Sequence, residues 1–161
     1  MMHTTIAKVL VPVVALLVLG VNAPGQTGQQ TQPAKSEPAA AKVPATTLEC
    51  LMAAYEGESN ANARYVEFAK KADEEGFGQV ASLFRAAARA EEIHTKNHAK
   101  VIKETGGTAK ADIKKPEVKS TRENLEAALK GESYERYTMY PDFSKRATKD
   151  KNRDALRTFT Q

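Results

Sequence analysis

The chain has 161 residues, a formal charge of +4 and a single cysteine, Cys50. This length indicates one principal domain, and one cysteine excludes both an intramolecular disulfide and a Cys-x-x-Cys metal module. Because acidic and basic residues are interleaved, the modest positive charge argues against a nucleic-acid-binding surface.

The first 46 residues differ in composition from the rest. Residues 9–21 are apolar except for Gly20, a stretch too short to span a bilayer comfortably but typical of a signal-peptide core. We therefore predict a signal peptide over residues 1–23 and an exported, periplasmic protein. The alternative is an uncleaved N-terminal segment that tethers the chain to the membrane. Residues 24–46 are rich in Pro, Gln and Ala and are predicted to form a disordered linker.

The remaining domain, residues 47–161, is predicted to be helical throughout. A capping box, Thr46-x-x-Glu49, indicates the start of a first helix, and Gly76 is a plausible end. The inward-facing positions follow at steps of three and four: Leu51, Tyr55, Glu58, Asn62, Tyr65 and Ala69. A carboxylate, Glu58, therefore lies in the middle of an otherwise core-facing row.

A second helix is predicted from Phe77 to Glu104, before Gly106 and Gly107. Its inward row also mixes apolar and ionisable side chains: Phe77, Val80, Phe84, Ala87, Glu91, His94, His98 and Val101. A buried carboxylate is costly unless something neutralises it. Glu91 and His94 are spaced i and i+3, so both project from one face of the helix.

A basic connection up to Lys119 is long enough to cross over the bundle. A second capping box, Ser120-x-x-Glu123, predicts a third helix. Its inward row is Leu125, Leu129, Glu132, Glu135 or Arg136, Met139 and Phe143. After a break at residues 150–153, Ala155, Leu156 and Phe159 begin a fourth helix, which is truncated where the chain ends at Gln161.

The two halves of the domain repeat. Gly57-Glu58-Ser59 and Gly131-Glu132-Ser133 are 74 residues apart, whereas Phe68 and Phe143, like Phe84 and Phe159, are 75 apart. One residue is therefore inserted in the third helix between Ser133 and Phe143. Because Pro141 lies in this window and cannot donate a backbone hydrogen bond, we predict that the extra residue forms a π-bulge.

Carboxylates and a histidine on core-facing rows indicate a metal site inside a helical bundle. A four-helix di-iron site combines one Glu from each of two helices with a Glu-x-x-His from each of the other two. Oxygen and imidazole ligands without thiolates suit iron or manganese. Other polar side chains on these rows are interpreted differently: His98 as a supporting or satisfied core histidine, Tyr65 as packing, and Tyr140 as part of an aromatic cluster with Tyr134 and Tyr137.

From Thr46 onward the chain resembles the di-iron domain of rubrerythrins. The resemblance is carried by residues 55–65, 68–77 and 90–94, and by residues 131–135 with 139–143. It implies an all-α, ferritin-like four-helix bundle with a long crossover. It also implies that Glu58 is a terminal ligand, Glu91 bridges two irons and His94 binds one of them. Glu132 would be the second-half counterpart of Glu58, and Glu135 a carboxylate that exchanges with the histidine.

The sequence departs from the family in two respects. It lacks the Cys-rich rubredoxin domain, so an external electron donor is expected. The repeat would place a second Glu-x-x-His at positions 166 and 169, beyond Gln161. Of three accounts we favour the first, a fragment of a longer protein whose continuation supplies the missing ligands. The alternatives are a homodimer that completes the site by symmetry and a degenerate helical module with an incomplete site. The homodimer is the expected assembly.

The resemblance implies a non-haem di-iron oxidoreductase that reduces hydrogen peroxide in oxidative-stress defence. The alternative activity is ferroxidase, with O2 as substrate and iron sequestration as outcome. Both would use the same ligands: Glu58, Glu91, His94, Glu132 and Glu135.

Overall fold

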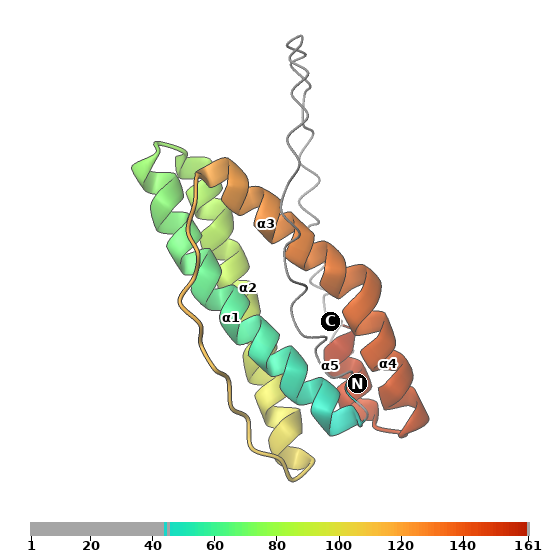
Figure 1. Cartoon of the computed structure of the whole chain (residues 1–161). Helices are drawn as coiled ribbons and strands as arrows, with labels where there is room; N and C mark the ends of the chain where they lie inside the picture. Colours follow the sequence, from blue (N-terminus) through green and yellow to red (C-terminus); the bar gives the residue numbers. More distant parts are fainter. Residues whose placement is uncertain (1–43, 45, 161) are drawn as a thin grey trace, which may run out of the picture. The chain divides into compact units, whose positions relative to one another are not determined.

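In the computed structural model, residue 44 and residues 46–160 are described, and every regular element among them is a helix (Figure 1). The signal peptide predicted for residues 1–23 and nearly all of the predicted linker lie outside this range. None of the described helices combines the length and the apolar character needed to cross a membrane.

Two long helices, α1 (Thr47–Glu74) and α2 (Gly78–Glu104), form a hairpin and lie side by side in Figure 1. The capping box predicted for the start of α1 is present: the Thr46 hydroxyl accepts from the Glu49 N–H at 3.2 Å, and Glu49 accepts from the Thr46 N–H at 3.0 Å. The hairpin turns at Gly76, whose φ of +80° falls in the left-handed region that favours glycine. Both predicted helices are confirmed.

The crossover runs along the hairpin and leads to α3 (Thr121–Tyr134) (Figure 1). The side chain of Asn60 fastens it to α1, donating to the carbonyl of Asp112 at 3.0 Å and accepting from the Lys114 N–H at 2.9 Å. The second predicted capping box, between Ser120 and Glu123, is also present. These contacts fix where α3 begins relative to the hairpin.

A π-helix, η1 (Glu135–Met139), separates α3 from α4 (Tyr140–Lys149). It lies inside the window where the repeat predicted one inserted residue, so the predicted π-bulge is confirmed. Pro141 follows directly at the start of α4, where its missing N–H disturbs the hydrogen-bond ladder least.

A last helix, α5 (Arg153–Phe159), confirms the predicted start of the fourth helix. The chain turns into it at Lys151, with a φ of 55°. The side chain of Asn152 then caps α5 by accepting from the Ala155 N–H at 2.9 Å.

Two apolar clusters lie along the bundle. One contains Phe68 and Phe84, with ring centroids 5.4 Å apart, and the other contains their repeat counterparts Phe143 and Phe159, 5.6 Å apart. The duplication seen in sequence is therefore also a duplication of core packing. Glu58 lies on α1 between the contributions of this helix to the two clusters.

Two apolar side chains that were predicted to face inward are exposed. Phe77 is 53% exposed because it precedes α2 in the turn instead of lying on the helix face. Leu129 is 57% exposed because α3 meets the hairpin through Leu125 and Ala128. Only Leu129 lies at the predicted helical spacing, on a face of α3 that is turned away from the hairpin.

Candidate metal centre

Three of the predicted ligands lie together between α1 and α2. One ligand atom from each of Glu58, Glu91 and His94 falls within 4.8 Å of the others. His94 Nδ1 is 3.2 Å from Glu91 Oε2 and 3.8 Å from Glu58 Oε1. The i, i+3 spacing on α2 turns Glu91 and His94 toward the same point, where α1 brings Glu58.

The other two predicted ligands, Glu132 and Glu135, come from the second half of the domain and interact electrostatically with Glu91. Glu132 lies near the end of α3 and is largely exposed, while Glu135 opens the π-helix and is half-buried. Glu135, and not the exposed Arg136, takes the inward position. Burial raises the pKa of Glu135 to about 8, with the Glu58 and Glu132 carboxylates adding to the effect. The structure thus brings three of the five predicted residues together, and the other two, Glu132 and Glu135, lie near enough to act on the Glu91 carboxyl.

The carboxyl groups of this centre are hard to ionise without a cation. Burial raises the pKa of Glu58 to about 9, and the adjacent Glu91 carboxyl raises it further. Burial also raises the pKa of Glu91, to which Glu132 and Glu135 contribute. Desolvation and like charge both disfavour the carboxylate form. A bound divalent cation would reverse this preference by supplying the missing positive charge.

One buried oxygen tests whether these residues fit a metal. Glu58 Oε2 is fully buried and accepts no hydrogen bond from the residues that the structure describes. The Glu91 carboxyl beside Glu58 can bond it only while one of the two carries a proton, although buried polar atoms are nearly always paired. Carboxylate oxygens with an imidazole nitrogen are donors suited to iron or manganese. The donor set and this buried oxygen therefore fit a cation held between Glu58, Glu91 and His94.

Two tyrosines that sequence reasoning had assigned to packing and an aromatic cluster also contact the centre. The Tyr140 hydroxyl donates to Glu58 Oε1, and the Tyr65 hydroxyl donates to Glu132 Oε1 at 2.6 Å. Tyr65 and Tyr140 are 75 residues apart, the repeat offset. Each half thus supplies a tyrosine that bonds the carboxylate of the other half. The offset was the signal that could have identified the pair.

His98 lies behind Tyr140 and is completely buried. Its Nε2 is 3.1 Å from the Tyr140 hydroxyl, and its Nδ1 is 3.2 Å from Thr158 Oγ1 on α5. Burial lowers the pKa of His98 to about 4, and the positive charge of His94 adds to the effect. This agrees with the interpretation of His98 as a satisfied core histidine.

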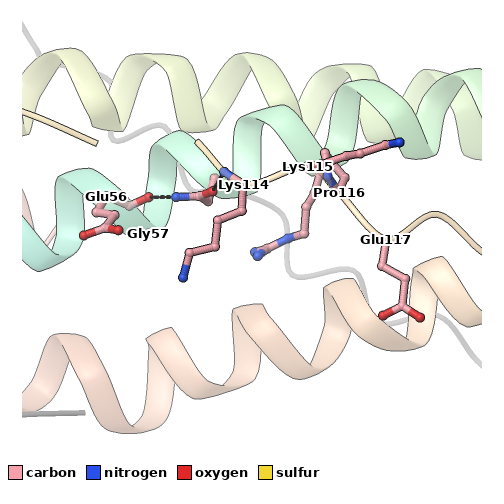
Figure 2. Close-up of a pocket in the computed structure, with 8 residues that line it drawn as sticks. Glu56, Gly57, Lys114, Lys115, Pro116 and Glu117 are labelled. Carbon is pink, nitrogen blue, oxygen red and sulfur yellow. Dashed lines mark hydrogen bonds between the residues drawn. The ribbon is translucent and has the colours of Figure 1, made fainter. Parts of the chain in front are cut away.

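A separate open pocket of about 390 Å³ lies between α1 and the crossover (Figure 2). Its lining residues are Glu56, Gly57, Asn60, Arg64, Lys114, Lys115, Pro116 and Glu117. Gly57 and Arg64 relate it to the metal centre: Gly57 precedes Glu58, and the charge of Arg64 acts on Glu135 by lowering its pKa.

A helical bundle with carboxylates and a Glu-x-x-His gathered between its helices defines the class of ferritin-like metal-binding proteins. Comparison with known proteins specifies the class further. The rubrerythrin family model matches residues 49–161, and the chain belongs to this family of ferritin-like di-iron proteins.

Curated relatives support the assignment. Nigerythrin of Nitratidesulfovibrio vulgaris is 41% identical over 117 residues, which are 72% of this chain and 58% of that protein. Rubrerythrin-2 of Clostridium acetobutylicum is 35% identical over 117 residues, 71% of this chain and 63% of that protein. The chain therefore spans less than two thirds of the length of these relatives.

A solved structure agrees in fold. The fully reduced, all-ferrous state of nigerythrin matches with a TM-score of 0.70 and 35% sequence identity, covering 84% of this chain and 71% of that one. The ferritin-like fold predicted from the sequence is confirmed.

Proposed function

We propose that the centre binds two iron ions and that the protein reduces hydrogen peroxide. The observation that carries the proposal is a buried oxygen of Glu58 that accepts no hydrogen bond among the described residues and lies among carboxyl groups that resist ionisation. Glu58, Glu91, His94, Glu132 and Glu135 would hold the metals. Manganese could replace iron at such ligands. Membership of the rubrerythrin family supports iron and peroxide chemistry.

The placement of Glu91 supports its role as the bridging ligand. Its carboxyl group interacts with Glu58 from the first half of the domain and with Glu132 and Glu135 from the second half. A carboxylate that is shared by two groups of ligands can contact a cation in each. Bridging carboxylates also screen the repulsion between two cations, so Glu91 is the residue whose loss should affect both positions.

When bound, the iron pair would supply the two electrons that cleave the O–O bond of peroxide. The protein's own residues position the ligands and limit the access of water. Tyr65 and Tyr140 hold one oxygen each of Glu132 and Glu58, and the burial of Glu58 and Glu91 limits water at their side of the centre. The His94 side chain is 25% exposed, so among the three clustered ligands it is the one that a small substrate could reach from solvent.

Three further proposals complete the functional picture. We propose that the protein is exported to the periplasm by residues 1–23, that it forms a homodimer, and that an external donor returns electrons to the centre. Fractionation of cells that express the full chain tests the first, and a periplasmic protein starting near residue 24 is expected. Sedimentation of the iron-loaded protein tests the second, and a monomer would contradict it.

Anaerobic iron loading followed by oxidant addition tests the main proposal. We expect reduced protein to consume H2O2 faster than O2, and Glu91→Ala to lose both metal binding and consumption. Glu126→Ala, which removes an exposed carboxylate on α3, is the matched control and should behave as wild type. Faster reaction with O2 would indicate a ferroxidase, and failure of the wild type to bind iron would refute a di-iron centre.

A further inference from the structure

We propose that His98 is a positioning residue for the metal centre. With Thr158 and Tyr140 it forms a hydrogen-bond chain of fixed direction that orients the Glu58 carboxylate and leaves its second oxygen available to a metal ion. This inference rests on the proposed function, because it gives a role to Glu58 as a ligand. It assigns functions to two residues, His98 and Thr158, that lie outside the ligand set.

Three contacts link α5 to the centre. Thr158 Oγ1 lies 3.2 Å from His98 Nδ1, His98 Nε2 lies 3.1 Å from the Tyr140 hydroxyl, and that hydroxyl donates to Glu58 Oε1. The hydrogen-bond chain therefore passes from α5 through α2 and α4 to α1. Because it joins four helices, it can transmit their packing to the position of one carboxylate.

The contacts determine a direction once Glu58 is an ionised metal ligand. A carboxylate can only accept, so the single hydroxyl hydrogen of Tyr140 points to Glu58. The Tyr140 oxygen must then accept from His98, which requires the Nε2–H tautomer. His98 Nδ1 is left as an acceptor, and the hydroxyl hydrogen of Thr158 fills it. Each link uses one donor and one acceptor.

The burial of His98 and Thr158 keeps water from competing for the hydrogen bonds of this chain. His98 is 0% exposed and Thr158 is 7% exposed. The imidazole lies against Tyr140 and Phe159, with ring centroids 6.1 and 5.8 Å away. A buried hydroxyl without such a partner would be free to rotate, so His98 restricts Tyr140 to the orientation that Glu58 needs.

The consequence is an asymmetry between the two oxygens of Glu58. Oε1 accepts from Tyr140, whereas Oε2 is buried and, in the part of the chain that the structure describes, no group donates a hydrogen bond to it. The repeat counterpart offers a contrast: among the described residues, Tyr65 bonds Glu132 and packs against Phe68 and Phe84, with no imidazole behind it. The hydrogen-bond chain thus supports the buried Glu58 carboxylate and not the exposed Glu132 carboxylate.

Metal affinity of matched variants tests the proposal. His98→Leu removes both contacts at similar volume, whereas His98→Gln keeps a donor toward Tyr140. We expect Mn(II) binding, measured by calorimetry at pH 7, to weaken about tenfold in His98→Leu, in the range seen when residues that support a ligand are removed. In His98→Gln most of the affinity should return. Equal affinities of both variants and the wild type would overturn the proposal.

Thr158→Val tests the direction of the hydrogen-bond chain. Thr148→Val is the control because, among the described residues, the Thr148 hydroxyl bonds its own helix at the carbonyl of Ser144. In Zn(II)-loaded wild type, ¹⁵N NMR should show His98 as the Nε2–H tautomer, and Thr158→Val but not Thr148→Val should mix the tautomers. A dominant Nδ1–H tautomer in the wild type would overturn the proposal. Failure of the wild type to bind any of these metals would instead refute the metal centre itself.

Discussion

Replacing Glu58 by Gln should stabilise the metal-free protein at neutral pH while abolishing its stabilisation by metal. Glu58 is 1% exposed and its pKa is raised to about 9 by burial and by the neighbouring Glu91. In the metal-free fold the group therefore keeps its proton at pH 7, whereas the unfolded chain releases it. Gln resembles the protonated form but does not ionise when the chain unfolds.

The magnitude follows from proton linkage. A carboxyl group whose pKa is raised on folding contributes stability that is complete below its unfolded pKa of 4.5 and is lost as the pH rises toward the folded value of about 9. Each pH unit in this window costs about 1.4 kcal/mol. At pH 7 the wild type should therefore have lost about 3 kcal/mol that Glu58→Gln retains. Near pH 4 the two proteins should be almost equal.

Urea unfolding in the presence of a chelator, at intervals between pH 4.5 and 8, measures the difference. Glu56→Gln, on the exposed side of the same helix, controls for the loss of a charge. A difference between Glu58→Gln and wild type that stays constant with pH would refute the reasoning. So would a variant that is less stable than wild type at pH 7.

Bound metal should reverse the order of stability of wild type and Glu58→Gln. Saturating Mn(II) stabilises whichever protein binds it, by about 2.7 kcal/mol at a hundredfold excess over Kd. Wild type should gain this amount, and Glu58→Gln should gain much less because the amide oxygen is a weaker ligand than a carboxylate. The same residue would then destabilise the empty centre and stabilise the filled one, which is the expected signature of a metal ligand.

Four other predictions can be checked by the same unfolding and binding assays. Gly57→Ala should stabilise the protein by about 0.5–1 kcal/mol, because an added Cβ meets nothing within 4 Å and glycine is unfavourable inside a helix; a loss would reveal a tighter contact there. Phe84→Ala should cost about 3–5 kcal/mol by opening a cavity in the core, and a loss below about 1 kcal/mol would contradict that packing. Asn124→Ala should cost about 1–3 kcal/mol, since it leaves the backbone N–H and C=O of Lys119 without the side chain that bonds both; no change would mean that water replaces the side chain. Deleting Thr138 should weaken Mn(II) binding at least as much as His98→Leu, because it removes the π-helix and turns Tyr140 away from Glu58; unchanged affinity would show that the π-helix is dispensable.

Local signals predicted the helices and the trio at the centre. The capping boxes at Thr46 and Ser120 each pair a side chain with the backbone three residues away, so all their hydrogen bonds form within the first turn of one helix. Glu58, Glu91 and His94 were recognisable because ionisable groups on a core-facing row need a compensating partner. Both kinds of signal depend on the spacing of residues within one helix, which can be seen directly in the sequence.

Contacts between helices were harder to predict. Whether Tyr65 packs or donates depends on how far α3 lies from α1, and no spacing within one helix encodes that distance. Leu129 was assigned to the wrong side for the same reason, since the packed face of α3 depends on how the helix lies on the hairpin. Thr158 gave no signal at all, because its partner is 60 residues away on α2.

The repeat offset explains why the π-helix lies beside the centre. Before it, positions in the two halves are related by 74 residues, as Glu58 and Glu132 are; after it, they are related by 75, as Tyr65 and Tyr140 are. At the earlier offset Glu135 corresponds to Ala61, which is buried at 1% exposure. The second half thus places a carboxyl group where the first half has a methyl. A wider helical turn at this point gives the larger side chain room. It also restores the register that lets Tyr140 bond Glu58. The inserted residue therefore adds a carboxyl group to the second half and keeps the tyrosine–glutamate bonds between the two halves.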